Sequence, residues 1–157
     1  MPILKSFNVV TALSGSLLAG FLMAGTAMSA ETEDTIKYRH AAMEAMSGHV
    51  ASFLLIATNK IEAPEFLQSH ADALVDLSRQ LNLMFPEGSG GEDTHALPAI
   101  WEDPEGFSAA VIKMQETASA LQLATRAGNK SATMKAFAEA GKSCKGCHED
   151  YREEHDH

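Results

Sequence analysis

The 157-residue chain has only two cysteines, Cys144 and Cys147, which stand three positions apart. A disulfide between them would close a very small loop and stabilise little, because the benefit of a cross-link grows with the loop it closes. A structural zinc site would need a second pair of ligands. The chain also lacks the alternating pattern of β-strands, which excludes a thioredoxin-like setting for this C-x-x-C pair.

Basic residues are scarce as well. Twelve Lys and Arg stand against 21 Asp and Glu, and the formal net charge is −9. This balance argues against nucleic acid and anionic lipid surfaces as partners. It is compatible with attraction to a basic redox partner protein, although an acidic surface serves solubility equally well.

Only one long apolar segment is present, and it lies at the N-terminus. Lys5 precedes it and the small-residue stretch 24–30 closes it, which is the order of a secretory signal peptide. We predict that residues 1–30 are a cleaved leader, cut after Ser29 or after Ala30. A retained membrane anchor is the alternative, but Ser and Gly residues leave the apolar stretch short for a spanning helix.

Cleavage predicts a periplasmic protein without stable membrane insertion. Lys5 is the only charged side chain of the leader, so 11 basic and 21 acidic residues remain and the formal charge becomes −10. The mature chain, residues 31–157, has the length of one domain.

Four stretches of the mature chain carry apolar residues at three- and four-residue steps, which is the pattern of a helix with one buried face. They span about 32–59, 64–84, 104–127 and 130–151. Helix-start signals support the last two, with Asp103 and Asn129 as N-caps. Four helices without strand-like segments predict an all-α fold, an antiparallel four-helix bundle.

The same pattern predicts which residues of the first stretch face the core. The first stretch has His40 and Leu54 on its apolar face, beside Met43.

Residues 86–103 form a long connection of loop character, which Trp101 is expected to anchor by packing. The charged tail from Arg152 onward is expected to fray.

The most informative residues are the consecutive Cys144, Lys145, Gly146, Cys147 and His148. C-x-x-C-H is the attachment signature of a c-type haem, in which each sulfur bonds a vinyl group and the histidine binds iron. Spacings of three and four residues place both sulfurs and the imidazole on one helix face. We therefore predict one covalently bound haem c on Cys144 and Cys147, with His148 as an iron ligand.

With this motif near the end of a predicted bundle, the chain resembles the class II c-type cytochromes, the cytochrome c′ family. The resemblance covers essentially the whole mature chain. It rests on KYRHAAM at 37–43, LMFPEGS at 83–89, residues 99–101, and residues 141–152 around the motif. It implies a four-helix bundle with the haem near the C-terminus, often as a homodimer through the first two helices.

The resemblance also implies roles for two residues of the first stretch. Arg39 matches an arginine near a haem propionate, and a guanidinium fork suits a carboxylate; a plain surface charge is the alternative. Met43 matches the position facing the iron opposite the histidine. A methionine there is the sixth ligand in low-spin members and only crowds the site in five-coordinate ones. Met46 and His40, one turn away on either side, are rival ligands.

Two functions follow from these two coordination states. If Met43 binds the iron, the saturated shell favours an electron carrier between redox partner proteins, with no reaction catalysed on a substrate. If the position is open, the haem binds NO or CO, for gas sensing or nitric oxide scavenging. The methionine at position 43 favours the electron carrier, with gas binding as the alternative. A zinc or thiol module, the third hypothesis, lacks further ligands.

We predict that the exported protein carries one covalent haem. After expression with the maturation machinery for c-type haem, its intact mass should equal a chain starting at Ala30 or Glu31 plus one haem. The haem should remain attached after acid–acetone extraction, because thioether bonds are covalent. A variant with both Cys144→Ser and Cys147→Ser should show the bare polypeptide mass. A bare mass for the unaltered chain would contradict the prediction.

Overall fold

The computed structural model describes residues 23–92 and 94–153, with side-chain surroundings from residue 32 onward. The predicted leader lies largely outside these residues, and its cleavage stays a prediction. The helical elements are α1 (Met23–Ala57), η1 (Pro64–Phe66), α2 (Leu67–Ser78), η2 (Leu81–Met84), α3 (Ala99–Glu102), α4 (Pro104–Arg126) and α5 (Lys130–Tyr151).

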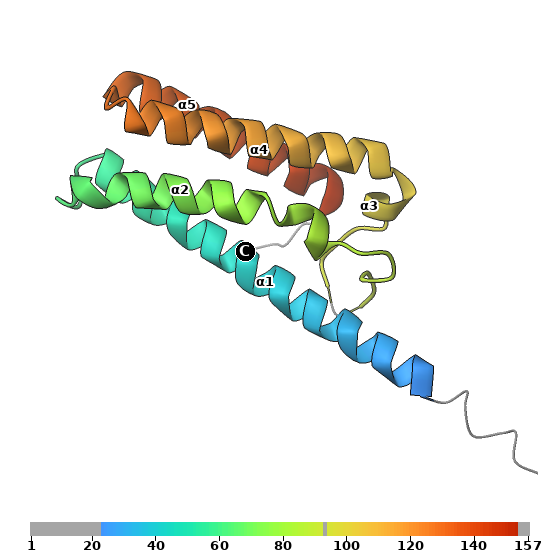
Figure 1. Cartoon of the computed structure of the whole chain (residues 1–157). Helices are drawn as coiled ribbons and strands as arrows, with labels where there is room; N and C mark the ends of the chain where they lie inside the picture. The colour runs from blue at the N-terminus through green and yellow to red at the C-terminus, as the bar shows by residue number, and fades with distance from the viewer. Residues whose placement is uncertain (1–22, 93, 154–157) are drawn as a thin grey trace, which may run out of the picture.

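The long helices α1, α2, α4 and α5 form an antiparallel four-helix bundle, as predicted (Figure 1). Close backbone contacts join α1 to α2, α2 to α4, and α4 to α5. The last turns of α5 lie at the same end of the bundle as α3 and the start of α4 (Figure 1). None of the described helices is both long enough and apolar enough to cross a bilayer.

Apolar residues from all four long helices fill the core. Phe53 of α1, Leu74 of α2 and Leu121 of α4 are at most 2% exposed. The Phe53 ring stacks on Phe137 of α5, with centroids 5.1 Å apart and planes 6° apart. Each such large side chain contributes roughly 1.5–3 kcal/mol through burial, so this layer is a main source of stability.

Local signals at the start of α4 and at the α4–α5 turn form as the sequence predicts. The Asp103 carboxylate accepts a hydrogen bond from the Gly106 N–H at 3.0 Å. Gly128 has a φ of +69°, in the left-handed region that favours glycine after a helix. Asn129 Oδ1 then accepts from the Ala132 N–H at 3.0 Å and starts α5. These caps satisfy backbone donors that have no partner within the helix.

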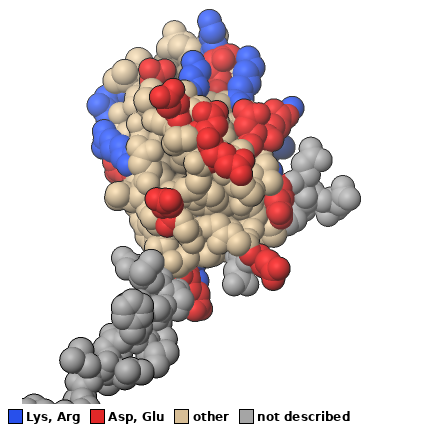
Figure 2. All heavy atoms as spheres, turned by 90° about the vertical axis from the view of Figure 1, so that its right-hand side faces the viewer, with Lys and Arg blue, Asp and Glu red and all other residues tan. Residues whose placement is uncertain are grey.

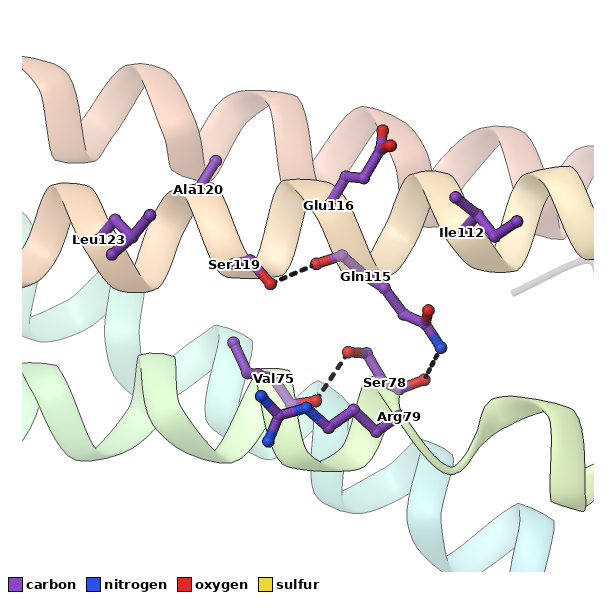
Figure 3. Close-up of a pocket in the computed structure, with 9 residues that line it drawn as sticks. All are labelled: Val75, Ser78, Arg79, Ile112, Gln115, Glu116, Ser119, Ala120 and Leu123. Atoms are coloured by element: carbon purple, nitrogen blue, oxygen red, sulfur yellow. Dashed lines mark hydrogen bonds between the residues drawn. The ribbon is translucent and has the colours of Figure 1, made fainter.

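The second predicted helix is interrupted, which differs from the continuous stretch expected over 64–84. Helix α2 ends at Ser78, whose hydroxyl donates to the Val75 carbonyl (Figure 3). The Ser78 carbonyl accepts from Gln115 Nε2 of α4 at 3.1 Å, so α4 supplies a donor that the helix would otherwise provide. The chain resumes as η2, which brings Met84 to complete burial.

The buried stripe of α1 differs from the prediction. His40 and Leu54, expected on the apolar face, are exposed, whereas Arg39 is only 3% exposed. Arg39 lies three residues after Ile36 and seven before Met46, so it shares their helix face. A search for apolar residues passes over it because its side chain is charged.

The C-terminal tail does not fray from Arg152 as predicted. Arg152 forms an isolated antiparallel bridge with Ala96, and the Glu153 N–H donates to the His95 carbonyl at 2.9 Å. The last four residues lie outside the described part of the chain. The long connection is thereby tied to the end of α5.

Trp101 anchors the long connection, as expected. Its indole Nε1–H donates to the Pro86 carbonyl at 3.0 Å. A Cβ at Gly90 would lie 3.0 Å from the Trp101 ring, so a larger residue there would press on the indole. The loop is therefore fixed by packing at both ends.

Removing the N-cap of α4 should destabilise the protein measurably. Asp103→Ala should lower the free energy of unfolding by about 1 kcal/mol, because the Gly106 N–H loses its acceptor. Asp103→Asn keeps an acceptor and should restore most of that loss. Urea unfolding of the haem-loaded protein, followed by far-UV circular dichroism, measures both. Equal stability of the Ala variant and the parent would show that the cap contributes nothing.

Candidate functional site

The C-x-x-C-H residues lie on the last turns of α5, on the side that meets the bundle. Cys144 and Cys147 are free thiols, half-buried, and packed against the core. His148 is also half-buried. The two sulfurs and the imidazole therefore come from one helix segment, as their spacing predicts.

Burial favours the neutral forms of all three side chains. Desolvation raises the pKa of both thiols, and Cys144 and Asp150 raise the pKa of Cys147 further. Burial and, less strongly, the charge of Arg152 lower the pKa of His148. A neutral imidazole offers a lone pair to iron. A zinc site would instead use the two thiols as thiolates, the form that burial disfavours here.

The donor set fits a covalently held haem better than an ion bound by the chain alone. Among residues 32–92 and 94–153, no group of three or more His, Cys, Asp or Glu side chains is placed to hold a metal ion. The two thiols and the imidazole therefore do not converge as zinc ligands do. Spread along one helix face, they match two vinyl groups at a porphyrin edge and the iron at its centre.

The spacing of the helices also suits a flat macrocycle. The pair α1 and α5 is not among the helix pairs with several close backbone contacts. Helix α1 diverges from α5 toward the end that carries the motif (Figure 1). Side chains, not closely packed backbones, thus lie between the motif and α1. A macrocycle would fit between them once these side chains rearranged.

Helix α4 supplies neighbours of the motif that sequence reasoning missed. Cys144 Sγ lies 3.5 Å from Sδ of Met114, which is 5% exposed. One residue earlier, Ser143 Oγ donates to the Ala140 carbonyl and lies 2.8 Å from Thr117 Oγ1. These contacts fix the turn of α5 that carries the first sulfur. In the sequence, Met114 is indistinguishable from any other methionine in a buried stripe.

Three side chains of α1 are rivals for the side of the iron opposite His148. His40 is exposed, and its ring stacks with His95 at a centroid distance of 6.4 Å and an angle of 18°. Met43 is half-buried against the core, and Met46 is 8% exposed within it. Helix α1 therefore turns thioethers, not an imidazole, toward the core. Ligation of iron by Met43 stays a prediction.

Arg39 is buried between α1 and the loop that follows η2. Its Nη1 donates to the Met84 carbonyl at 3.0 Å and to Ser89 Oγ at 3.2 Å. Its Nη2 donates to the Ser89 carbonyl at 2.9 Å and to Thr94 Oγ1 at 2.6 Å. The guanidinium carbon also lies 4.7 Å from the centre of the Phe85 ring.

These contacts exclude the surface-charge interpretation of Arg39. Four bonds match the four Nη hydrogens, so Nε–H is the remaining guanidinium donor for a haem propionate. That propionate contact stays a prediction. Sequence reasoning identified residues 86–92 as a loop but did not identify their acceptors, because nothing local reports a partner 50 positions away.

Acidic side chains gather on the end of the bundle near the motif. Figure 2 shows them over the upper part of this face, with basic side chains mostly toward its rim. The α3–α4 junction at this end carries the exposed Glu102, Asp103 and Glu105. A basic protein approaching this end would be attracted.

A groove of about 530 Å³ between α2 and α4 lies outside this site. Its walls include Arg79, the residue after α2, and Gln115 and Glu116 of α4 (Figure 3). It contains none of the predicted haem-site residues, so it has no part in haem attachment.

Comparisons with known proteins agree with this arrangement. A family model described as Cytochrome C′ matches residues 34–152. The chain is 33% identical over 125 residues to cytochrome c′ of Pararhodospirillum photometricum, which covers 79% of this chain and 100% of the relative. It is 34% identical over 131 residues to cytochrome c-554 of Cereibacter sphaeroides, and that match covers 78% of this chain and 96% of the relative.

Solved structures show the same fold. The chain matches the crystal structure of cytochrome c′ from Rubrivivax gelatinosus with a TM-score of 0.72 and 29% identity, over 78% of this chain and 97% of that one. It matches a nitric oxide complex of a mutant cytochrome c prime from Alcaligenes xylosoxidans with a TM-score of 0.72 and 28% identity, over the same shares.

Removing the buried guanidinium should cost much more than removing an exposed one. Arg39→Ala should lower the free energy of unfolding by roughly 2–4 kcal/mol, because buried acceptors in the loop lose their donors. Arg79→Ala is the matched control, since Arg79 forms an exposed ion pair with Asp76 at 3.0 Å. That change should cost less than about 1 kcal/mol. Urea unfolding of the haem-loaded proteins tests both, and equal losses would contradict the role of Arg39.

Proposed function

Because this chain belongs to the cytochrome c′ family, which implies covalent haem c, we propose that it carries one haem and binds nitric oxide or carbon monoxide. In this proposal Cys144 and Cys147 form the two thioether bonds, and His148 is the iron ligand from the chain. Haem c, when bound, supplies an iron that takes up a diatomic gas and exchanges one electron. The protein turns over no substrate.

The position of His40 is the observation that carries the preference for these gases. His40 is exposed and stacked with His95, so its imidazole is directed away from the core. Met43 and Met46, on the buried side of α1, have no N–H or O–H group. Hydrogen-bond donors in the distal pocket help to decide O₂ binding, and neither of these two thioethers is a donor. The proposal therefore names NO and CO in place of O₂.

Solved relatives support the same ligand class. A mutant cytochrome c prime from Alcaligenes xylosoxidans is described as a nitric oxide complex, at 28% identity to this chain. A ferrous variant from the same organism is described with bound NO, at 27% identity and a TM-score of 0.73. We extend this ligand class to the present chain on the strength of the family and of the apolar side of α1.

Three residues of the chain have distinct tasks in the proposal. Met43, a half-buried and flexible thioether, limits the space that a gas must enter. Burial lowers the pKa of His148, which favours the neutral imidazole and its lone pair for iron. Arg39 fixes the loop after η2 and directs its remaining Nε–H to a haem propionate.

Electron transfer between redox partner proteins is the second candidate, and Met43 is the observation that favours it. A Met43 thioether on the iron would complete the coordination shell, so that little rearranges when an electron arrives or leaves. It would also raise the reduction potential. The acidic end of the bundle would then attract a basic partner (Figure 2).

The proposal locates the protein in the periplasm, because residues 1–30 have the features of a cleaved leader. It also includes a homodimer through α1 and α2. Four apolar residues at the corner of these helices are 40–56% exposed, and a second copy would cover them. They are Leu54, Leu55, Ile61 and Phe66.

Absorption spectra with added gas test the proposed function. The ferrous protein should bind CO and NO with a shift of the Soret band, and the ferric protein should be high-spin. Met43→Ala should speed CO association by about tenfold, or about 1.4 kcal/mol of barrier, because it widens the path to the iron. Met134→Ala, which truncates a half-buried methionine of α5 lining a hollow beside the α1–η1 turn, should leave the rate unchanged.

Two results would overturn gas binding. One is a ferric spectrum with the charge-transfer band of a methionine–iron bond that disappears in Met43→Ala, together with no CO binding by the parent. That result would establish the electron carrier. The other is a haem-loaded parent whose spectrum is insensitive to both gases in either oxidation state.

A further inference from the structure

His49 of α1 and His70 of α2 form a pair that haem attachment does not use. Their Nδ1 atoms lie 3.0 Å apart, although the residues are 21 positions apart in the chain. The ring centroids are 5.2 Å apart, and the planes are inclined by 58°. Both rings are half-buried. Neither histidine belongs to a motif, so the sequence alone assigns them no task.

The short distance between two ring nitrogens constrains their protonation. One Nδ1 must carry a hydrogen and the other must offer a lone pair, because two lone pairs or two N–H groups would repel. A single shared proton therefore joins α1 to α2 at this point. If that hydrogen moves from Nδ1 to Nε2 of the same ring, the two Nδ1 atoms present two lone pairs close enough to bind one metal ion.

We propose that His49 and His70 form a binding site for a divalent copper ion. Two nitrogens at 2.0–2.1 Å from one ion, with a right angle between the bonds, lie about 2.9 Å apart. A tetrahedral angle would require about 3.3 Å. The Nδ1 atoms, 3.0 Å apart, are thus already about as far apart as two ligands at a right angle on one ion, as in tetragonal Cu²⁺ sites. To bind one ion, each ring must turn so that its Nδ1 lone pair points at the ion, which lies beside the line between the two Nδ1 atoms.

The donor set selects the kind of metal. Within the described part of the chain, no third His, Cys, Asp or Glu joins the pair in a group that could hold an ion. Water therefore fills the other positions. Two imidazoles without a carboxylate do not suit Ca²⁺ or Mg²⁺, which need oxygen ligands. Among first-row divalent ions, affinity for nitrogen ligands peaks at Cu²⁺, so copper should bind more tightly than zinc or nickel.

Copper bound here would cross-link the first two helices of the bundle. The ligands come from separate helices, so the unfolded chain does not hold them together. An ion that binds the folded state more tightly raises the stability of that state. One equivalent of Cu²⁺ should therefore raise the melting temperature of the parent protein and leave variants without the pair unchanged.

The test uses ferric, haem-loaded, mature protein titrated with copper chloride. His155 and His157 are replaced by Ala in every sample, because histidines near a chain end bind copper by themselves. The electron paramagnetic resonance spectrum at one equivalent should show coupling to two nitrogens. His49→Gln and His70→Gln should each weaken copper binding at least about tenfold. His40→Gln, which removes an exposed imidazole from the same helix, is the matched control and should leave the affinity unchanged.

Circular dichroism of the haem-loaded variants before copper is added checks that each one folds. His70→Asn is the second choice if His70→Gln does not fold, because a shorter amide also removes the imidazole ligand. Equal copper affinity of the parent and both folded pair variants would overturn the proposal. A signal with one nitrogen, or one lost only in His40→Gln, would overturn it as well. Gas binding is measured separately at the haem band, so the two proposals fail independently.

Discussion

The inward orientation of one turn of α5 is the constraint on which the rest of the structure depends. Two sulfurs and an imidazole from a single helix can hold a macrocycle only if that face meets the bundle. Met114 and Thr117 of α4 contact Cys144 and Ser143 and so hold this turn in place. Helix α1 makes fewer close backbone contacts with α5 than α4 does. The fold therefore provides a fixed wall on the α4 side and an adjustable one on the α1 side.

A chain of ring contacts links the buried guanidinium to the motif. Arg39 lies over the Phe85 ring, and Phe85 meets Phe107 edge-on at 5.0 Å between centroids. Phe107 in turn meets Tyr151 at 5.2 Å, three residues after His148. The loop after η2, the start of α4 and the end of α5 thus pack as one unit. Arg39 secures that unit to α1, so its burial supports the site whether or not it also meets a propionate.

The two proposed functions differ in one bond, between the Met43 thioether and iron. The fold is compatible with both, because a methionine is flexible enough either to bind or to stand aside. The outward position of His40 removes the imidazole that rivalled Met43 as an iron ligand. The His49–His70 pair lies apart from this choice, since it joins α1 to α2 and involves neither α4 nor α5.

The sequence by itself determined what depends on residues close together in the chain. Helical spacing set the face shared by Cys144 and His148, and local capping residues such as Asp103 set where helices begin. Only the tertiary structure decided the burial of Arg39 and the pairing of His49 with its partner on α2, because these contacts join residues 21 to 55 positions apart. The break after Ser78 belongs with them, since the donor that satisfies its carbonyl lies on another helix. Local spacing carries no record of such partners, which packing alone brings together.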